Sequence, residues 1–185
     1  MERKLKGSVV MEMVKVVRAF PDQPWERCLL PEDVEIVDSM IIPAEWYPIE
    51  FFQRVGLAVY KLVAKGNDEV VAQFGRHAMK ELYEGPYRPF LAKGDPFAAT
   101  EKFLDLRRGL FNFSKMEMER TGEKSLRVSI SEFGTFEEGL DVFMLVLGVH
   151  FQELIKYNGG DEVNLDYHRE TEAGQIKMVF DLAWT

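Results

Sequence analysis

The sequence predicts a single α+β domain, in which an N-terminal helical half is followed by a four-stranded antiparallel sheet with one long crossing helix. Apolar residues recur at three- and four-residue intervals up to about residue 108, whereas from about residue 111 they mostly alternate with polar residues. The length of 185 residues suits one domain, 1–185, with a hydrophobic core. No repeat or low-complexity linker divides it.

Two helices are expected in the first third of the chain. The first should begin near Ser8, a plausible N-cap, and end before Pro21, because proline cannot continue a helix. The second should span about 49–63, with Phe52 and Val55 on its apolar stripe.

Two further helices carry clearer end signals. An acidic pair after Asn67 suits the positive end of a helix dipole, and this helix should end before Gly85. Asp95 and Pro96 predict the next start, because aspartate caps a helix and proline fits its first position. That helix should end before Gly109.

Strand patterns dominate the rest of the chain. Alternating runs at 111–118 and 126–130 should form two strands joined by a turn at Thr121-Gly122. Residues 135–138 have capping-box spacing and open a strongly apolar helix that should reach Tyr157. The runs 163–167 and 176–184 then predict two more strands.

The composition excludes several functional classes. With 23 Lys+Arg against 31 Asp+Glu, the net charge is −8, so we expect no nucleic-acid partner, because phosphate binding needs a basic surface. The longest apolar run, 142–149, is far shorter than the roughly 20 residues of a membrane-spanning helix. The charged start does not resemble a signal peptide. We therefore expect a cytoplasmic protein without a membrane span.

Familiar catalytic motifs are missing from the sequence, so we do not expect an enzyme. There is no glycine-rich phosphate loop, nucleophile elbow or zinc motif. The lone Cys28 has apolar neighbours and is expected to pack rather than react. Asp166, His168 and Glu170 alternate on one strand and could converge on a divalent ion, but a solvated strand face is the simpler interpretation. We expect no metal site.

The remaining histidines and the aromatic residues are the other candidates for functional roles. His77 is expected on the surface, and His150, within an apolar helix, is expected to be a hydrogen-bonded packing or interface residue. Aromatic side chains concentrate between the third helix and the first strands. They could line a small-molecule cavity or simply form core. These residues are Phe74, Tyr83, Tyr87, Phe90, Phe97, Phe103, Phe111 and Phe113.

Several short motifs together resemble H-NOX (haem nitric-oxide/oxygen-binding) domains. They are Lys6-Gly7-Ser8, Pro24-Trp25-Glu26-Arg27, Trp46-Tyr47-Pro48, Gln73-Phe74-Gly75-Arg76, Gly139-Leu140 and Leu147-Gly148. The chain is also similar to uncharacterised myxobacterial-type proteins within the wider vinyl-reductase, H-NOX and TRAPP-subunit ligand-binding fold. The resemblance implies a sensory or ligand-binding domain.

The departures from the H-NOX pattern concern haem. In that family a histidine on the helix after the glycine-arginine pair holds the iron, and counting from Gly75 places it near Leu106, where this sequence has none. The family's Tyr-x-Ser-x-Arg motif binds the haem propionates, and in this sequence only its serine is matched, by Ser131. Both anchors of haem are therefore missing. We expect a haem-independent domain with no cofactor.

The resemblance places a reduced apolar pocket where haem would lie. Its expected ligand-binding residues are Phe74, Tyr83, Tyr87, Phe103, Leu106 and Phe111. The hydroxyls of Tyr83 and Tyr87 could orient a small apolar ligand, and Arg107 and Arg108 could meet an acidic head group at its rim. The expected function is a sensory or small-molecule/lipid-binding module in signalling.

The alternative is a dimeric protein-interaction or scaffold domain without ligand. The helix expected at 136–157 is apolar on nearly every side and must be buried all round. A homodimer or a signalling protein partner could therefore cover part of it.

Overall fold

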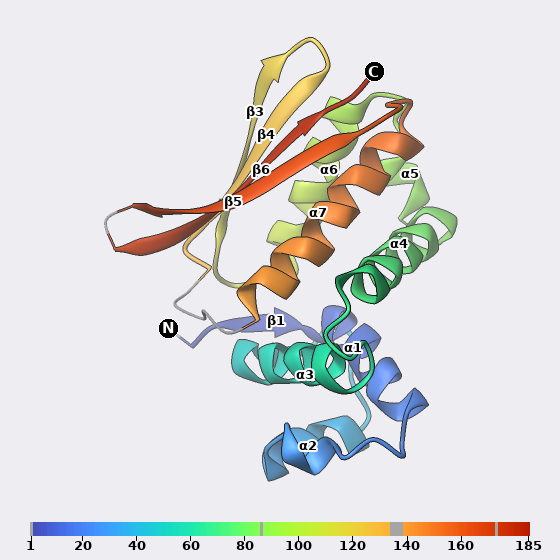
Figure 1. Ribbon diagram of the computed structural model, residues 1–185, viewed down its shortest axis with the longest axis vertical. Coiled ribbons are helices and arrows are strands. Elements are labelled where there is room, and N and C mark those ends of the chain that lie inside the picture. The colour runs from blue at the N-terminus through green and yellow to red at the C-terminus, as the bar shows by residue number, and fades with distance from the viewer. Residues whose placement is uncertain (1, 86, 134–138, 173) are drawn as a thin grey trace.

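The computed structural model describes residues 2–85, 87–133, 139–172 and 174–185, arranged as two packed parts (Figure 1). The N-terminal part contains β1 (Lys4–Lys6), α1 (Gly7–Ala19), η1 (Trp25–Arg27), α2 (Pro31–Asp38), β2 (Trp46–Pro48) and α3 (Ile49–Leu62). The C-terminal part contains α4 (Asp68–Glu84), α5 (Arg88–Leu91), α6 (Pro96–Arg108), β3 (Lys115–Gly122), β4 (Ser125–Ser131), α7 (Leu140–Tyr157), β5 (Asn164–Glu172) and β6 (Gln175–Ala183).

The predicted α+β class is confirmed. The C-terminal strands form one antiparallel sheet in the order β3-β4-β6-β5. Val128 of β4 pairs with Phe180 of β6, and both are fully buried against the helices. The turn between β3 and β4 was placed too early by the sequence, because Gly122 pairs with Ser125 and the turn residues are Glu123 and Lys124.

The first helix begins two residues earlier than a Ser8 cap would place it, and Ser8 is not its cap. The N-cap is Lys6, which makes no side-chain cap hydrogen bond. The backbone N–H groups of Gly7 and Ser8 instead donate to the carbonyl oxygens of Glu45 and Pro43, at 2.9 and 3.1 Å. A long-range backbone contact therefore does the work of a capping side chain.

The predicted starts of α4 and α6 are confirmed, as is the predicted cap Asp95, and α4 is capped by Asn67. The side chain of Asn67 accepts a hydrogen bond from the backbone N–H of Glu69 at 3.0 Å. Asp95 accepts from the N–H of Phe97 at 2.8 Å. These local signals fix where each helix starts.

The short elements β1, β2, η1, α2 and α5 were not predicted. The two strands are three residues each and pair with each other, so their register depends on distant chain segments. In α2, Pro31 occupies the first turn, and Asp33 accepts from the Leu30 N–H at 2.9 Å. Arg54 of α3 pairs with the buried Asp33 through two 2.7 Å hydrogen bonds, which ties α2 to α3.

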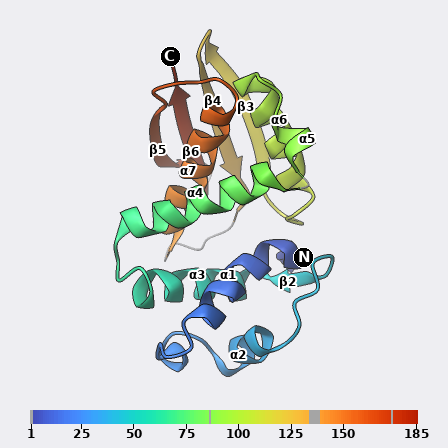
Figure 2. The ribbon, with the colours of Figure 1, turned by 90° about the vertical axis from the view of Figure 1, so that its right-hand side faces the viewer.

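Helix α7 lies on the sheet with α6 beside it, and α4 packs against its other side (Figure 2). The predicted cap at 135–138 lies outside the described residues. The buried side of α7 faces these neighbours along the whole helix. Gly148 allows α7 to approach β5 closely, because a Cβ added at this position would meet Leu165. Elements of the same chain thus cover much of this apolar helix. No helix among the described residues is long and apolar enough to cross a membrane.

Candidate functional site

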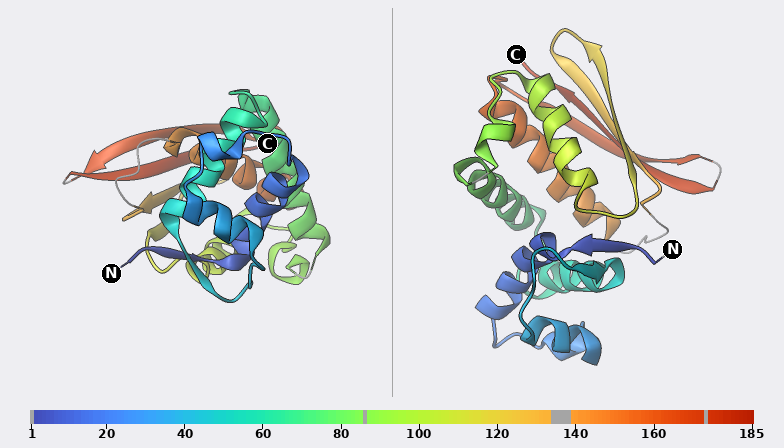
Figure 3. Two further views of the ribbon diagram at one scale, coloured as in Figure 1. Left: turned by 90° about the horizontal axis from the view of Figure 1, so that it is seen from below. Right: turned by 180° about the vertical axis from the view of Figure 1, so that it is seen from behind.

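The candidate site lies where α6 packs beside α7 (Figure 3, right). The buried stripe of α6 contains Phe103, Leu104 and Arg107. Because Arg107 follows Phe103 by four residues and Leu104 by three, helix geometry turns all three side chains toward the same face. An arginine is therefore carried into the apolar interface.

Arg107 is buried and forms no ion pair with any residue in the described ranges. Only 8% of the residue is exposed. Its Nε atom is shut off from solvent and has no hydrogen-bond partner in the described part of the chain. Its guanidinium carbon lies 4.9 Å from the ring centre of Phe111 and 5.7 Å from that of Phe103. Burial lowers the pKa of Arg107 to about 10, so the group still carries its charge near pH 7.

His150 approaches the same phenyl ring from α7. Its imidazole stands edge-on to Phe103, with ring centres 6.3 Å apart and planes at 89°. Both ring nitrogens are buried and lack a partner among the described residues. Burial, and then the positive charge of Arg107, lower the pKa of His150 to about 3, so the imidazole is neutral. The predicted packing role is confirmed, but no described residue forms the predicted hydrogen bond.

The N-terminal strand closes the site from the other part of the molecule. Leu5 of β1 is fully buried and forms a β-bridge with Phe111. The N–H of Lys6 donates to the Leu110 carbonyl at 2.8 Å, and the N–H of Asn112 donates to the Lys4 carbonyl at 3.1 Å. The segment after α6 is therefore attached directly to β1.

Aromatic rings extend from the site toward the start of α7. Phe111 lies edge-on to Phe113 at 5.6 Å, and Phe113 lies edge-on to Phe133 at 5.3 Å. Phe133 stacks on Phe143 of α7 at 4.7 Å. We call Phe111, Phe113, Phe133 and Phe143 the aromatic cluster.

Two of the predicted pocket residues, Phe103 and Phe111, lie together around Arg107. Phe74 and Leu106 are half-buried and pack against the core. Tyr87 is 38% exposed.

The hydroxyl of Tyr83 is used within the fold. It donates to the Leu91 carbonyl at 2.9 Å and accepts a hydrogen bond from Asn158 Nδ2. The Tyr83 ring stacks on Tyr157 at 4.2 Å. This group is a structural junction between α4, α5 and α7.

The arginine expectation needs correction. Arg107 is not at a rim but inside the α6–α7 interface, whereas Arg108 is engaged outside it, with Asp105 at 2.5 Å and the Met116 carbonyl at 3.0 Å. The proximity of Arg107 to His150 was not predicted from the sequence. A signal was present, since Arg107 shares the helical stripe of Phe103 and His150 lies in an apolar helix.

The other histidines lie on the surface. The side chain of His77 is 73% exposed, as predicted, and faces Glu81 at 3.5 Å. His168 faces Glu170 at 3.3 Å on the exposed strand β5. In residues 2–85, 87–133, 139–172 and 174–185, no group of three His, Cys, Asp or Glu side chains could hold a metal ion.

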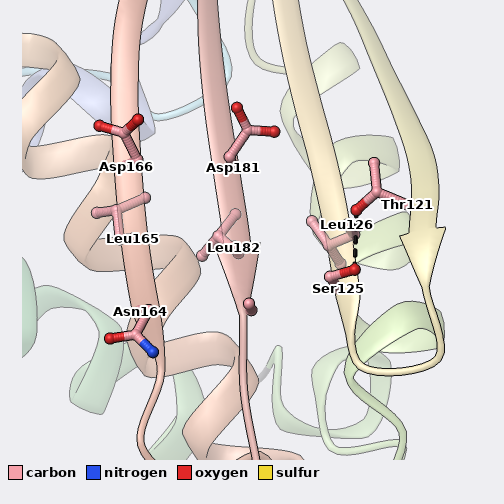
Figure 4. Close-up of a pocket in the computed structure, with 9 residues that line it drawn as sticks. Thr121, Ser125, Leu126, Asn164, Leu165, Asp166, Asp181 and Leu182 are labelled. Carbon is pink, nitrogen blue, oxygen red and sulfur yellow. Dashed lines mark hydrogen bonds between the residues drawn. The ribbon is translucent and has the colours of Figure 1, made fainter.

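A depression of about 310 Å³ lies over the outer part of the sheet, away from the α6–α7 site (Figure 4). It is lined by Thr121, Ser125, Leu126, Asn164, Leu165, Asp166, Asp181, Leu182 and Ala183. Asp181 is engaged there in a bidentate pair with Arg127, at 2.7 and 2.9 Å, and Thr121 donates to Ser125 at 2.9 Å. Three of its polar side chains, those of Thr121, Ser125 and Asp181, therefore already have partners within the sheet.

The residues present do not fit haem as the H-NOX pattern would hold it. Helix α6 contains no histidine, cysteine, methionine or tyrosine that could bind iron. Ser131 belongs to the β4 face opposite to the buried Val128 and Ile130, so it does not point toward the helices. At His150, the ring of Phe103 occupies the space beside the imidazole.

The fold and site define an α+β domain whose helices enclose a buried cation that forms no ion pair with any described residue, and solved structures share this fold. A single-site variant of T. tengcongensis H-NOX matches with a TM-score of 0.64 at 14% identity, over 98% of this chain and 98% of that chain. An oxygen-binding H-NOX domain related to soluble guanylate cyclases matches with a TM-score of 0.63 at 15% identity, over 98% of this chain and 95% of that chain. No family model matches the sequence, and no curated protein matches it significantly. The chain has an H-NOX-like fold.

Proposed function

We propose that this protein is a haem-free sensory domain that binds a small molecule between α6 and α7. The observation that carries the proposal is the pair of unpartnered polar groups, Arg107 and His150, around the Phe103 ring. Buried polar groups in folded proteins nearly always have a hydrogen-bond partner. A bound molecule would supply the partner that the described residues do not.

Binding without catalysis suits the chemistry of these two groups. A general base works best when its pKa lies near the working pH. With a pKa of about 3, His150 is a poor base near pH 7, but it remains able to donate and accept hydrogen bonds as a neutral imidazole. Arg107 offers charge and donors rather than a nucleophile.

Haem independence is supported by the side chains that replace the haem anchors. Leu106 stands near the position expected for the iron ligand, and the next residue in the helix, Arg107, brings a buried cation into the interface. A cation beside His150 disfavours further positive charge there, which includes a ferric ion.

Signal transmission would run through the segment after α6. A ligand that moves Phe111 also acts on Leu5, because these residues share the β-bridge between the two parts of the molecule. The N-terminal part would then pass the change to a signalling partner or to a second copy of the chain. Its exposed apolar side chains include Met40, Ile42 and Trp46.

Native mass spectrometry of the purified protein tests the proposal. We expect a co-purifying small molecule that is retained by the wild type and by Arg108→Met, and lost from Arg107→Met. A wild type free of small molecules, found as a stable dimer at micromolar concentration, would instead favour the scaffold function.

A further inference from the structure

We infer that the molecule bound between α6 and α7 is an aromatic carboxylate, with its carboxylate on Arg107 and its ring system against the aromatic cluster. This inference rests on the proposed function and specifies the ligand class. It follows from the charge, the donors and the ring geometry around Phe103.

The head group is defined by an uncompensated positive charge. The acidic residue of α6 nearest in sequence, Asp105, lies on the exposed side, where it pairs with Arg108 and Lys102. It therefore does not neutralise Arg107, which makes no ion pair within the described ranges. A guanidinium presents parallel N–H donors that match the two oxygens of a carboxylate. An anion would remove the cost of burying the charge alone.

His150 supports the same choice of head group. A neutral imidazole has one N–H donor, and both of its nitrogens here are free of partners in the part of the chain that the structure describes. A carboxylate oxygen can accept from this N–H as well as from Arg107. A cationic head group, by contrast, would repel Arg107 and leave its donors unpaired.

The body of the ligand is specified by the rings beside the charge. Phe103 and Phe111 flank the guanidinium, and Phe113 and Phe133 of the aromatic cluster continue from Phe111 in edge-on contacts of 5.6 and 5.3 Å. Aromatic pairs favour such edge-on arrangements over face-to-face stacking. A flat ring system can replace or extend one of these contacts, whereas a small inorganic anion would use only Arg107 and His150.

Isothermal titration calorimetry with matched probes tests the inference on the full chain. The probes are 2-naphthoate, its neutral analogue 2-naphthalenemethanol, and nitrate as a head group without a body. We expect 2-naphthoate to bind at least tenfold more tightly than either of the others. Arg107→Met should weaken 2-naphthoate binding at least tenfold, whereas Arg108→Met should leave it unchanged.

The outcomes separate the two proposals. If the alcohol binds as tightly as 2-naphthoate and Arg107→Met binds both like the wild type, the carboxylate assignment is wrong while a small-molecule site stands. If nitrate binds as tightly as 2-naphthoate, the proposal that the ligand has an aromatic body is wrong. If no probe binds and native mass spectrometry finds no ligand, both proposals are wrong. Arg107→Lys provides a folded comparison should the methionine variant be unstable, and it should retain part of the affinity because it keeps the charge.

Discussion

The guanidinium of Arg107 lies over the ring of Phe111, with 4.9 Å between the guanidinium carbon and the ring centre. This cation–π contact recovers part of the hydration that Arg107 loses on burial, typically about 1 to 2 kcal/mol. It supplies no anion and leaves the Nε–H without an acceptor among the described residues. In the ligand-free protein, the cost of burying the positive charge of Arg107 is therefore only partly compensated.

Arg107→Met should stabilise the ligand-free protein. Methionine keeps the length of the side chain and removes the buried charge. Replacing whole buried ion pairs by apolar residues of similar volume is often neutral or stabilising by about 1 to 4 kcal/mol. After loss of the cation–π contact, we expect a gain of about 1 kcal/mol in the free energy of unfolding by urea. Arg108→Met should change it by less than about 0.5 kcal/mol, as for other surface positions. A clear loss of stability in the Arg107 variant would show that the charge is satisfied after all.

His150 should make the protein less stable in mild acid. Its pKa is lowered from 6.5 to about 3 on folding, so between these values the unfolded chain binds a proton that the folded protein does not. Stability is therefore full above pH 6.5 and falls as the pH decreases. From this residue alone we expect a loss of about 2 kcal/mol between pH 7.5 and pH 5.

Unfolding curves of His150→Phe and of the wild type at both pH values measure this contribution. The variant should lack that part of the pH dependence, whereas His77→Gln, at an exposed position, should retain it. Equal pH dependence in His150→Phe and the wild type would mean that the imidazole is not buried as a neutral group.

Asn158→Ala should destabilise the C-terminal part by about 2 to 4 kcal/mol. The Oδ1 atom of Asn158 accepts from the N–H groups of Lys93 and Gly94 at 2.9 and 3.0 Å, and its Nδ2 donates to the Leu154 carbonyl at 2.8 Å. Removing the amide takes this partner from two partly buried N–H groups and one buried carbonyl, and leaving a buried group unpaired costs about 1 to 3 kcal/mol. Thermal unfolding compares this variant with Asn164→Ala at an exposed strand position, which should change little.

Gly7→Ala and Gly56→Ala should have opposite effects. A Cβ at Gly7 would lie 2.1 Å from the backbone oxygen of Ile42, whereas a Cβ at Gly56 meets nothing within 4 Å. We expect Gly7→Ala to cost about 1 to 3 kcal/mol through overpacking. Gly56→Ala in the middle of α3 should gain about 0.5 to 1 kcal/mol from helix propensity. Destabilisation of similar size in both would contradict the close contact at Gly7.

Local patterns predicted most of the fold. Asn67 and Asp95 marked helix starts correctly because their side chains cap neighbouring N–H groups, which is a property of adjacent residues. Alternation predicted the sheet because one face is buried. The start of α1 was misplaced because its first N–H groups bond to carbonyls at Pro43 and Glu45, a contact that local sequence does not specify.

The candidate site was predicted only in part. Phe103 and Phe111 were expected at the pocket, and they do flank Arg107. The approach of His150 to the same ring depends on how α7 packs beside α6, and helical spacing within each segment carries no information about that packing. Likewise, Tyr83 was a candidate because of its hydroxyl, but its partners Leu91 and Asn158 lie in other elements.

The most direct test of the account is a titration of the purified protein with haemin, followed by visible absorption spectroscopy before and after desalting. We predict no stoichiometric Soret band that survives desalting, because α6 offers no iron ligand and His150 is enclosed by Phe103 beside a cation. A sharp stoichiometric band that persists after desalting and disappears in His150→Phe would contradict the account, since it would identify His150 as the iron ligand of a haem protein.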